Sequence, residues 1–436
     1  MPEINLTASQ EVAASGIVAA YSRGDRVVGI QGMAGAGKTY MLKEAIDRLG
    51  LMDSTVFTAP THEACKQLKL DLPEDAKVMT IYKLAGMRVT EDHEEQFTVP
   101  ASELELDDYA VVVIDEVSMA GEGLYARFQE MRALYPNVLF ILVGDRYQLK
   151  PPKSPISPFF DEYRKPNSFE LMESMRMHPD SPVLATAMAI RSLIDEGYKG
   201  NVDFQPEKSE HGNIYVAPIK KFNESFCRAV QSEGYTPKRI VAIAYTNKRV
   251  EQLNRLARNA IHGKDAPDWL VGEEVTLLQP LQEEGFTLVN TNSTGVIMAV
   301  DCSVYSQQAM DMLPEFPVRC DDLSVNFDGI IQHCLVPDAM EGEKSFRDGL
   351  AYLKRRALQS QSKYDWRKFH QFRLSVAHMR HTYAITAHKS QGKSYDDVVY
   401  VDAVNMQHSK HRPSDLINLL NVAITRSRND VVIAQR

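Results

Sequence analysis

A glycine-rich stretch near the N-terminus has the residue types and spacing of a phosphate-binding loop. Residues 32–39 read Gly-Met-Ala-Gly-Ala-Gly-Lys-Thr, which satisfies the pattern G-x-x-x-x-G-K-[ST]. Glycines let backbone N–H groups approach phosphate oxygens closely, and the N-terminus of a following helix adds partial positive charge. In such a loop, Lys38 contacts the β- and γ-phosphates and the Thr39 hydroxyl binds Mg²⁺. The stretch therefore predicts a nucleoside triphosphate site.

Two later segments supply the polar groups that nucleotide hydrolysis requires. Asp115 and Glu116 directly follow the apolar run 110–114, and Gln148 comes shortly after the apolar run 138–143. We expect Asp115 to hold Mg²⁺, Glu116 to polarise the attacking water and Gln148 to lie near the γ-phosphate. Adjacent carboxylates after a strand often only cap a helix, but a phosphate-binding loop in the same chain favours the catalytic interpretation.

These residues need parallel strands whose carboxyl ends meet at one edge of a sheet. Apolar runs predict such strands at 27–30, 55–59, 110–114, 138–143 and 240–247. Helical periodicity follows at 40–46 and 250–260. Strands that alternate with helices predict an α/β fold built on parallel sheets.

The segment Thr7-Ala8-Ser9-Gln10 matches the capping box at the start of a helix. Gln10 has two interpretations. It is either part of that cap or a residue that recognises the adenine edge, because a carboxamide offers both a donor and an acceptor. The sequence leaves both open.

Composition limits the classes of protein that the chain can belong to. It has 436 residues, 44% of them hydrophobic, and a net charge of −9, so we expect two or more domains and no global basic field. The five cysteines form no C-x-x-C pair, which argues against a zinc ribbon and suits a reducing compartment. The N-terminus lacks the features of a signal peptide and the apolar runs are too short to span a bilayer, so we expect a cytoplasmic protein with no membrane partner.

The order of these motifs resembles the superfamily 1 helicases, and in particular group 1B with its RecD-like branch. Residues 386–394 are similar to the fifth motif of that family and residues 422–428 to the sixth. The resemblance implies an α/β fold of two RecA-like parallel-sheet domains, with a small inserted β-hairpin (pin) domain and an inserted SH3-like β domain. The implied boundaries are 1–86 and 104–170 for RecA-like domain 1A, 87–103 for pin domain 1B, 171–268 and 370–436 for RecA-like domain 2A, and 269–369 for SH3-like domain 2B.

The resemblance also implies roles for individual residues. Arg176 and Arg426 match arginines that reach the γ-phosphate across the cleft, a role that suits the planar, permanently charged guanidinium. The implied catalytic set is Lys38, Asp115, Glu116, Gln148, Arg176 and Arg426, with Thr39 and Asp115 as metal ligands. The implied nucleotide-binding set is Gln10, Gly32, Ala34, Gly35, Ala36, Gly37, Lys38, Thr39, Tyr40 and Gly392. The implied DNA-binding set is Pro60, His62, Thr80, Phe97, His388 and Lys389.

The function that follows from the resemblance is an ATP-dependent DNA helicase. It uses ATP and Mg²⁺, translocates 5′ to 3′ on single-stranded DNA and separates strands at forks. Its implied partners are single-stranded and forked DNA and a single-strand-binding protein or replisome components, and it acts as a monomer in the cytoplasm, that of the host if the source is a phage. Two alternatives stay open: a single-stranded-DNA translocase that displaces bound proteins, and a slow P-loop NTPase switch.

Several positions carry more than one interpretation. Phe97 lies in the predicted hairpin, whose tip is acidic at 91–95, and is either the residue that stacks on a base at the fork or a core aromatic. Thr80 is either a DNA contact or a helix cap. The basic, aromatic-rich segment 350–380 is either a DNA-facing surface or a solvated helix with inward-facing aromatics. Tyr82 and Asn421 depart from the family, which usually has histidine and an aromatic residue there.

Overall fold

The computed structural model describes residues 5–89, 95–151, 156–283, 286–408 and 415–436. Its contacts divide the chain into two compact units. The first unit comprises Met1–Phe226, Lys238–Val250 and Ile385–Arg436, and the second comprises Cys227–Pro237 and Glu251–Ala384. The predicted hairpin tip at 91–94 lies outside the described residues, and Glu95 begins the next described segment.

The first sheet of the larger unit carries the phosphate-binding loop. Its strands are β1 Val27–Gly32, β2 Thr55–Ala59, β3 Lys77–Thr80, β6 Val111–Ile114, β7 Leu139–Gly144 and β8 Ser168–Leu171. They pair in parallel in the order β3-β2-β6-β7-β1-β8. Because β6, β7 and β1 are neighbours, their carboxyl ends bring Asp115, Asp145 and the loop 32–39 to one edge, as the sequence predicts.

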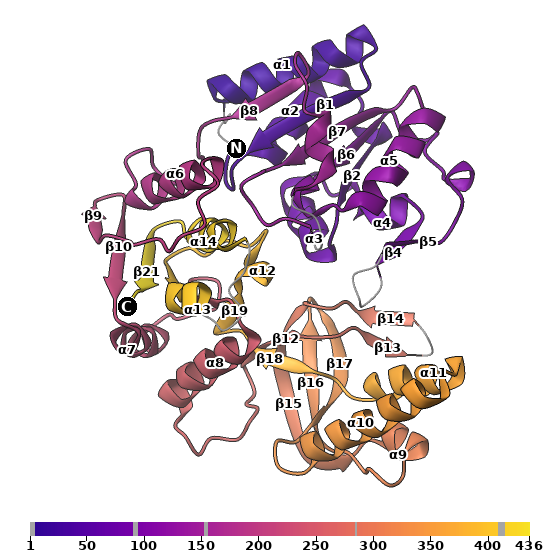
Figure 1. Cartoon of the computed structure of the whole chain (residues 1–436), viewed down its shortest axis with the longest axis vertical. Helices are drawn as coiled ribbons and strands as arrows, with labels where there is room; N and C mark the ends of the chain where they lie inside the picture. Colours follow the sequence, from indigo (N-terminus) through magenta and orange to yellow (C-terminus); the bar gives the residue numbers. More distant parts are fainter. Residues whose placement is uncertain (1–4, 90–94, 152–155, 284–285, 409–414) are drawn as a thin grey trace. The chain divides into compact units, whose positions relative to one another are not determined.

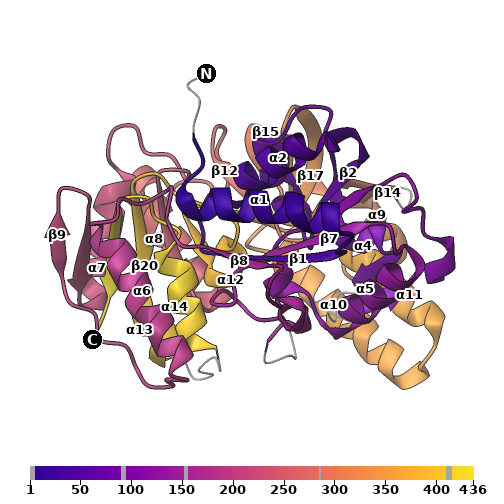
Figure 2. The same cartoon turned by 90° about the horizontal axis from the view of Figure 1, so that it is seen from above.

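Helices cover both faces of this sheet. The surrounding elements are α1 Ala8–Arg23, α2 Lys38–Leu49, α3 His62–Asp71, α4 Ile81–Leu84 and α5 Glu122–Leu134, with short 3₁₀ turns at Met52–Ser54, Ala101–Glu103, Val117–Met119 and Pro158–Glu162. Alternate strand residues enter two cores. Val111 and Val113 pack with α1 and α2, whereas Val112 and Ile114 pack with α5. Figure 2 shows α1 and α2 on one side of β1 and β7, and α5 on the other. This is the doubly wound arrangement of a RecA-like domain.

A second, mostly parallel sheet follows in the same unit (Figure 1). Its strands are β9 Glu207–Ser209, β10 Gly212–Ala217, β11 Ile240–Ala244, β19 Ala384–Thr386, β20 Val398–Val401 and β21 Asp430–Ala434, in the order β19-β11-β20-β21-β10-β9. The accompanying helices are α6 Pro182–Asp195, α7 Ile219–Val230, α8 Asn247–His262, α12 Ala387–Ser390, α13 Ala403–His408 and α14 Leu416–Ile424. The predicted strand 240–247 is too long, because the Thr246 hydroxyl accepts the Arg249 N–H at the start of α8. The predicted fold of two RecA-like sheets is confirmed.

The smaller unit contains an antiparallel sheet, three complete helices and most of α8 among its described residues. Its strands pair in the order β17-β16-β15-β12-β18, with bounds β12 Glu274–Leu277, β15 Thr294–Tyr305, β16 Arg319–Phe327, β17 Ile330–Pro337 and β18 Met379–His381. A separate hairpin joins β13 Leu281–Glu283 to β14 Phe286–Val289, and the helices are α9 Gln307–Met312, α10 Gly342–Ser360 and α11 Lys363–Arg373. The sheet thus includes a strand beyond residue 369. The SH3-like assignment stays a prediction.

Helices α10 and α11 cover most of the basic segment 350–380. Phe372 is fully buried and Phe369 packs on the same core, whereas Tyr364 is exposed. The buried Asp365 carboxylate pairs with Arg356. The segment therefore forms helices with part of its aromatic set packed inward, and a role in DNA binding is untested.

A buried carboxylate holds the smaller unit together. Glu273 accepts hydrogen bonds from Arg258 Nε at 2.9 Å and from the Tyr383 hydroxyl at 3.1 Å, which ties β12 to α8 and to the chain before β19. Burial raises the pKa of Glu273, but hydrogen bonds from His381 and Arg258 outweigh it and lower the value to about 2. Removing one partner of a buried pair leaves the other charge uncompensated.

We predict that Glu273→Gln lowers the free energy of unfolding by about 3 kcal/mol at pH 7. Because the folded-state pKa is depressed, the contribution of Glu273 is fully present above the unfolded-state pKa and is lost as the pH falls toward about 2. Thermal unfolding of wild type and variant between pH 7 and pH 3 measures this. The control is Glu251→Gln, which breaks an exposed pair with Arg380. Curves that keep the same separation at all pH values contradict the prediction.

Candidate nucleotide site

The phosphate-binding loop lies between β1 and α2, with Gly35 and Gly37 in the left-handed region at φ +80° and +70°. A Cβ atom at Gly35 would meet the Arg176 side chain at 2.5 Å, and one at Gly37 would meet Gln10 Nε2 at the same distance. These glycines are therefore required by both backbone conformation and close packing. The Lys38 ammonium donates to the carbonyls of Gly32 and Met33 at 3.0 and 3.3 Å, so it folds back over the loop.

Gln10 links the first helix to this loop. The capping box is present as predicted, because Thr7 Oγ1 accepts the Gln10 N–H and Gln10 Oε1 accepts the Thr7 N–H. The amide nitrogen of the same side chain, Gln10 Nε2, donates a hydrogen bond to the Ala36 carbonyl at 2.9 Å. Gln10 therefore positions the loop backbone as well as the helix, and adenine recognition stays a prediction.

The two carboxylates lie at the end of β6. Asp115 is buried and its Oδ1 accepts the Glu116 N–H at 2.8 Å. Burial and the Glu116 carboxylate raise the pKa of Asp115 to about 7, against the lowering effect of Lys38. Glu116 has φ +52°, a strained conformation for a residue with a side chain, and its buried Oε2 has no hydrogen-bond partner among the described residues. An unpaired acceptor held in this way is suited to orient a water molecule.

Arginines from distant parts of the chain gather beside the loop. Arg176 donates from Nη1 to the Thr425 carbonyl at 3.2 Å, and Arg426 donates to the carbonyls of Val422 and Lys393. Burial, together with the charges of Arg426 and Arg428, lowers the pKa of Arg176 to about 9. Burial also lowers the pKa of Arg426, with Glu116 acting in the opposite direction. This concentration of positive charge suits a polyanionic ligand.

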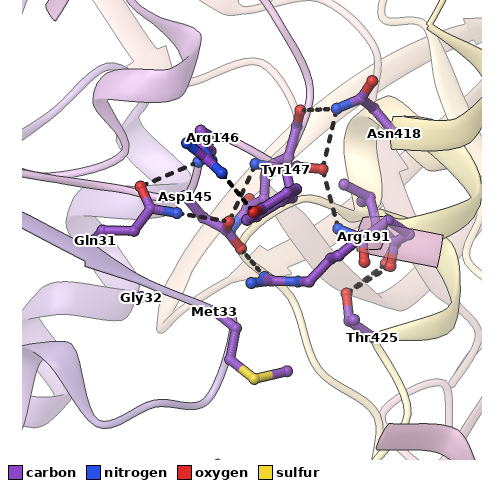
Figure 3. Close-up of polar contacts among 12 residues, drawn as sticks. Gln31, Gly32, Met33, Asp145, Arg146, Tyr147, Arg191, Asn418 and Thr425 are labelled. Atoms are coloured by element: carbon purple, nitrogen blue, oxygen red, sulfur yellow. Dashed lines mark hydrogen bonds and ion pairs between the residues drawn. The ribbon is translucent and has the colours of Figure 1, made fainter. Parts of the chain in front are cut away.

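Figure 3 shows the loop that follows β7. Asp145 is paired with Arg191 of α6 and accepts Gln31 Nε2 at 3.3 Å. Gln148 is buried, and its Oε1 has no hydrogen-bond partner among the described residues. Asn418 donates from Nδ2 to the carbonyls of Tyr147 and Gln148. The sequence predicted Gln148 but missed its supports.

Two further residues of the predicted nucleotide set are Tyr40 and Gly392. Tyr40 is in the first turn of α2 and is 36% exposed. Gly392, at φ +79°, directly precedes Lys393, whose carbonyl accepts Arg426 Nη1 at 3.1 Å. Arg428 was missed as a site residue, although it lies in the predicted sixth motif two positions after Arg426.

The predicted DNA residues lie at the carboxyl ends of strands. Pro60 and His62 follow β2, and Thr80 ends the neighbouring β3, where Ala59 pairs with Thr80. Thr80 Oγ1 accepts the Lys83 N–H at 3.3 Å, so it caps α4, which confirms that interpretation without testing DNA contact. His388 and Lys389 lie in α12 after β19, and the ring centroids of His388 and Tyr245 are 6.1 Å apart. The structure thus places Pro60, His62 and Thr80 at one edge of the first sheet, and His388 and Lys389 next to a strand of the second.

Phe97 lies at the end of the hairpin formed by β4 Met87–Val89 and β5 Glu95–Phe97. It is 55% exposed, so it is not a core aromatic, and its ring lies 4.4 Å from the Arg127 guanidinium. The hairpin is fixed by Glu95, which accepts the Tyr82 hydroxyl and the Leu124 N–H, both at 2.9 Å. Tyr82, which departs from the family, therefore supports the hairpin.

His178, Asp180 and His211 lie close enough together to suggest a metal site. The two imidazole rings are stacked at 3.5 Å between centroids and 17° between planes, so their lone pairs run nearly parallel instead of converging. His178 Nδ1 also accepts the Asp180 N–H at 3.2 Å. We assign no metal to this group.

Comparison with known proteins shows which families and relatives the chain is similar to. Residues 5–202 match the family profile described as an AAA domain, and residues 381–434 match the UvrD-like helicase C-terminal domain. These matches, together with the motifs, are consistent with a helicase-type P-loop ATPase of superfamily 1B. It is 26% identical over 452 residues to the ATP-dependent DNA helicase dda of Enterobacteria phage T4, covering 98% of each chain.

Solved structures of low identity support the fold. The Pif1 helicase from Candida albicans matches with a TM-score of 0.52 and 16% identity, covering 99% of this chain and 95% of that one. Bacteroides Pif1 in complex with ADP-AlF3 and ssDNA matches with a TM-score of 0.51 and 14% identity, covering 99% and 93%. In the described part of this chain, no helix has both the length and the apolar character needed to cross a bilayer.

We predict that Arg176→Gln lowers ATP turnover without lowering thermal stability. Removing one of the clustered positive charges relieves repulsion, so the nucleotide-free variant unfolds at or above the wild-type temperature. Its ATP turnover falls on the order of a thousandfold, because the γ-phosphate loses a charge-stabilising group. Differential scanning fluorimetry and a phosphate-release assay measure both. Arg48→Gln, which removes surface pairs with Glu11 and Glu44, is the control with unchanged turnover. A marked fall in the unfolding temperature of Arg176→Gln contradicts the prediction.

Proposed function

We propose that this protein is an ATP-dependent DNA helicase that couples hydrolysis to 5′-to-3′ translocation on single-stranded DNA and to strand separation. The observation that carries the proposal is the convergence of Arg176 and Arg426 on the phosphate-binding loop and Asp115-Glu116. Arg176 comes after the last strand of the first sheet and Arg426 belongs to the second, so residues from both sheets then act on one nucleotide. Hydrolysis consequently depends on how the two sheets are held together, which is the requirement for converting ATP turnover into movement.

The phosphate-binding loop holds the nucleotide. The N-terminus of α2 offers backbone N–H groups to the phosphates, and the Lys38 ammonium leaves the carbonyls of Gly32 and Met33 to bind them. Thr39 and Asp115 offer hard oxygen donors that fit Mg²⁺, whose chemistry is to neutralise phosphate charge. Deprotonated Asp115 is needed for this, and the Lys38 ammonium favours that form.

Glu116 and Gln148 act on the attacking water. Each carries a buried oxygen without a hydrogen-bond partner among the described residues, which leaves both oxygens able to accept a hydrogen bond from water. Glu116 orients the water and takes up its proton, and Gln148 fixes its position. Arg176 and Arg426 stabilise the charge that develops on the phosphoryl oxygens.

DNA binding is assigned to the carboxyl edges of the two sheets. Pro60, His62 and Thr80 serve the first sheet, and His388 and Lys389 serve the second. Hydroxyl, imidazole and ammonium groups bind phosphates without reading bases, so affinity depends on salt and only weakly on sequence. The similar phage T4 protein is an ATP-dependent DNA helicase by name, which supports this choice of nucleic acid.

The domain roles follow the sequence-based boundaries: 1–86 with 104–170 binds ATP, 87–103 is the pin, 171–268 with 370–436 completes the cleft and 269–369 is the SH3-like insert. The protein acts as a monomer on forked DNA, alongside a single-strand-binding protein or replisome components. Its location is the cytoplasm, which is that of the host cell if the source is a phage like that of the similar protein.

A translocase that displaces proteins without a separating pin is the second candidate. The contact between the Phe97 ring and the Arg127 guanidinium favours it, because a ring that is already stacked must leave that partner to stack on a base.

We predict that ATP hydrolysis requires single-stranded DNA and that unwinding requires a 5′ tail. The measurement uses fluorescent duplexes with either a 5′ or a 3′ single-stranded tail, together with phosphate release on the same substrates. A slow P-loop switch would show hydrolysis that does not respond to DNA. Unwinding only from the 3′ tail would overturn the polarity while keeping the helicase.

We predict that Phe97→Ala lowers the unwinding rate on the order of tenfold and leaves DNA-stimulated ATPase within about twofold, because loss of one stacked base contact weakens strand separation only. The matched control is Val89→Ala, which truncates an exposed side chain on the same hairpin. Unchanged unwinding by Phe97→Ala, with retained displacement of a protein bound to single-stranded DNA, would support the translocase instead.

A further inference from the structure

Helix α14 carries two asparagines in an otherwise apolar, fully buried sequence. Its residues read Leu-Ile-Asn-Leu-Leu-Asn-Val-Ala-Ile, and Asn418 and Asn421 are 4% and 1% exposed. Asparagine is a poor helix former, and burying its amide without partners costs about 1–3 kcal/mol. The spacing of three puts both amides on one face of the helix. A buried polar pair of this kind needs a specific partner.

The partner of both amides is the backbone of Tyr147 and Gln148. Asn418 Nδ2 donates to the carbonyls of Tyr147 and Gln148 at 3.1 and 3.0 Å, and Asn421 Nδ2 donates to the Tyr147 carbonyl at 3.0 Å. The loop is also fixed from its own side, because the Gln148 N–H donates to the Asp145 carbonyl at 3.0 Å. The backbone of Gln148 is thus held at both its N–H and its carbonyl, while its side-chain oxygen has no partner among the described residues.

The same helix leads directly to the arginine of the sixth motif. The Thr425 hydroxyl accepts Arg426 Nη2, and the Thr425 carbonyl accepts Arg176 Nη1. A movement of α14 therefore acts on both Arg426 and the Gln148 loop. Figure 3 shows Asn418 directed at the Tyr147 loop, with Thr425 farther along the same segment.

We propose that Asn418 and Asn421 are positioning residues that clamp the Tyr147–Gln148 backbone to α14, so that Gln148 and Arg426 reach the γ-phosphate together. The proposal rests on the proposed function and concerns the control of that site. Resemblance to the family places an aromatic residue at position 421, so the resemblance does not predict the bond from Asn421. Its bonds join neutral groups, which can separate and reform as the nucleotide is hydrolysed.

The test uses the full-length protein with Asn421→Leu and Asn418→Leu, which keep side-chain size and remove the donor. We expect kcat of DNA-stimulated hydrolysis to fall on the order of tenfold, the equivalent of one hydrogen bond, while KM for ATP changes less than about twofold. In a Gln148→Ala background, Asn421→Leu should lower kcat by less than about twofold further, because both changes remove one coupled unit.

The matched control is Asn254→Leu. Asn254 is also 4% exposed, and its amide likewise bonds to backbone, through Oδ1 with the Ala384 N–H at 2.8 Å. This variant should lose thermal stability without losing kcat, which separates positioning from general destabilisation. If Asn421→Leu does not fold, Asn421→Ser provides a smaller change for the same measurements.

Different failures have different meanings. A wild-type protein that does not hydrolyse ATP with single-stranded DNA overturns the proposed function and the clamp with it. An active wild type with unchanged kcat in the asparagine variants overturns the clamp alone. So does a full additional fall of kcat in the Gln148→Ala background, or an equal fall in Asn254→Leu.

Discussion

The positive charge gathered beside the phosphate-binding loop is the constraint on which the rest of the site depends. Burial lowers the pKa of Arg176, and the charges of Arg426 and Arg428 act in the same direction, so keeping Arg176 charged is costly. A protein tolerates such repulsion where an anionic ligand relieves it. Gly35 and Gly37 have left-handed backbone conformations and no side chain, which lets Arg176 and Gln10 approach the loop. The position of the Arg176 charge therefore depends on the glycine at position 35.

The loop after β7 connects this charge to the rest of the unit. Asp145 pairs with Arg191 in a buried, charged contact, and the Tyr147 hydroxyl donates to Asp195 of the same helix α6 at 2.8 Å. The asparagines of α14 hold the backbone of the same loop from another element. The loop that carries Gln148 is therefore held by two elements from distant parts of the chain, α6 and α14.

Sequence alone predicted the loop 32–39, Asp115-Glu116 and Gln148, because phosphate chemistry fixes residue types at short spacing next to strands. It also predicted the capping box at Thr7, which is local. It missed Asn418 and Arg191, because their partners lie far away in the chain and no local pattern announces a hydrogen bond to a backbone carbonyl. The polar positions within the apolar run 416–424 were the available signal. Tyr82 was noticed only as a departure from the family, since its partner Glu95 becomes visible only in the folded hairpin.

Two kinds of contact hold the loop that carries Gln148, and they differ in the free energy needed to break them. The Arg191–Asp145 pair is buried, so separating it exposes two poorly solvated charges and is costly. The bonds from Asn418 and Asn421 join neutral amides to carbonyls, and their net contribution is about 1 kcal/mol each. Helix α6 packs against α14 and β10, so the ion pair and the amide bonds both join the loop after β7 to elements of the second sheet, and the ion pair is the costlier of the two to break.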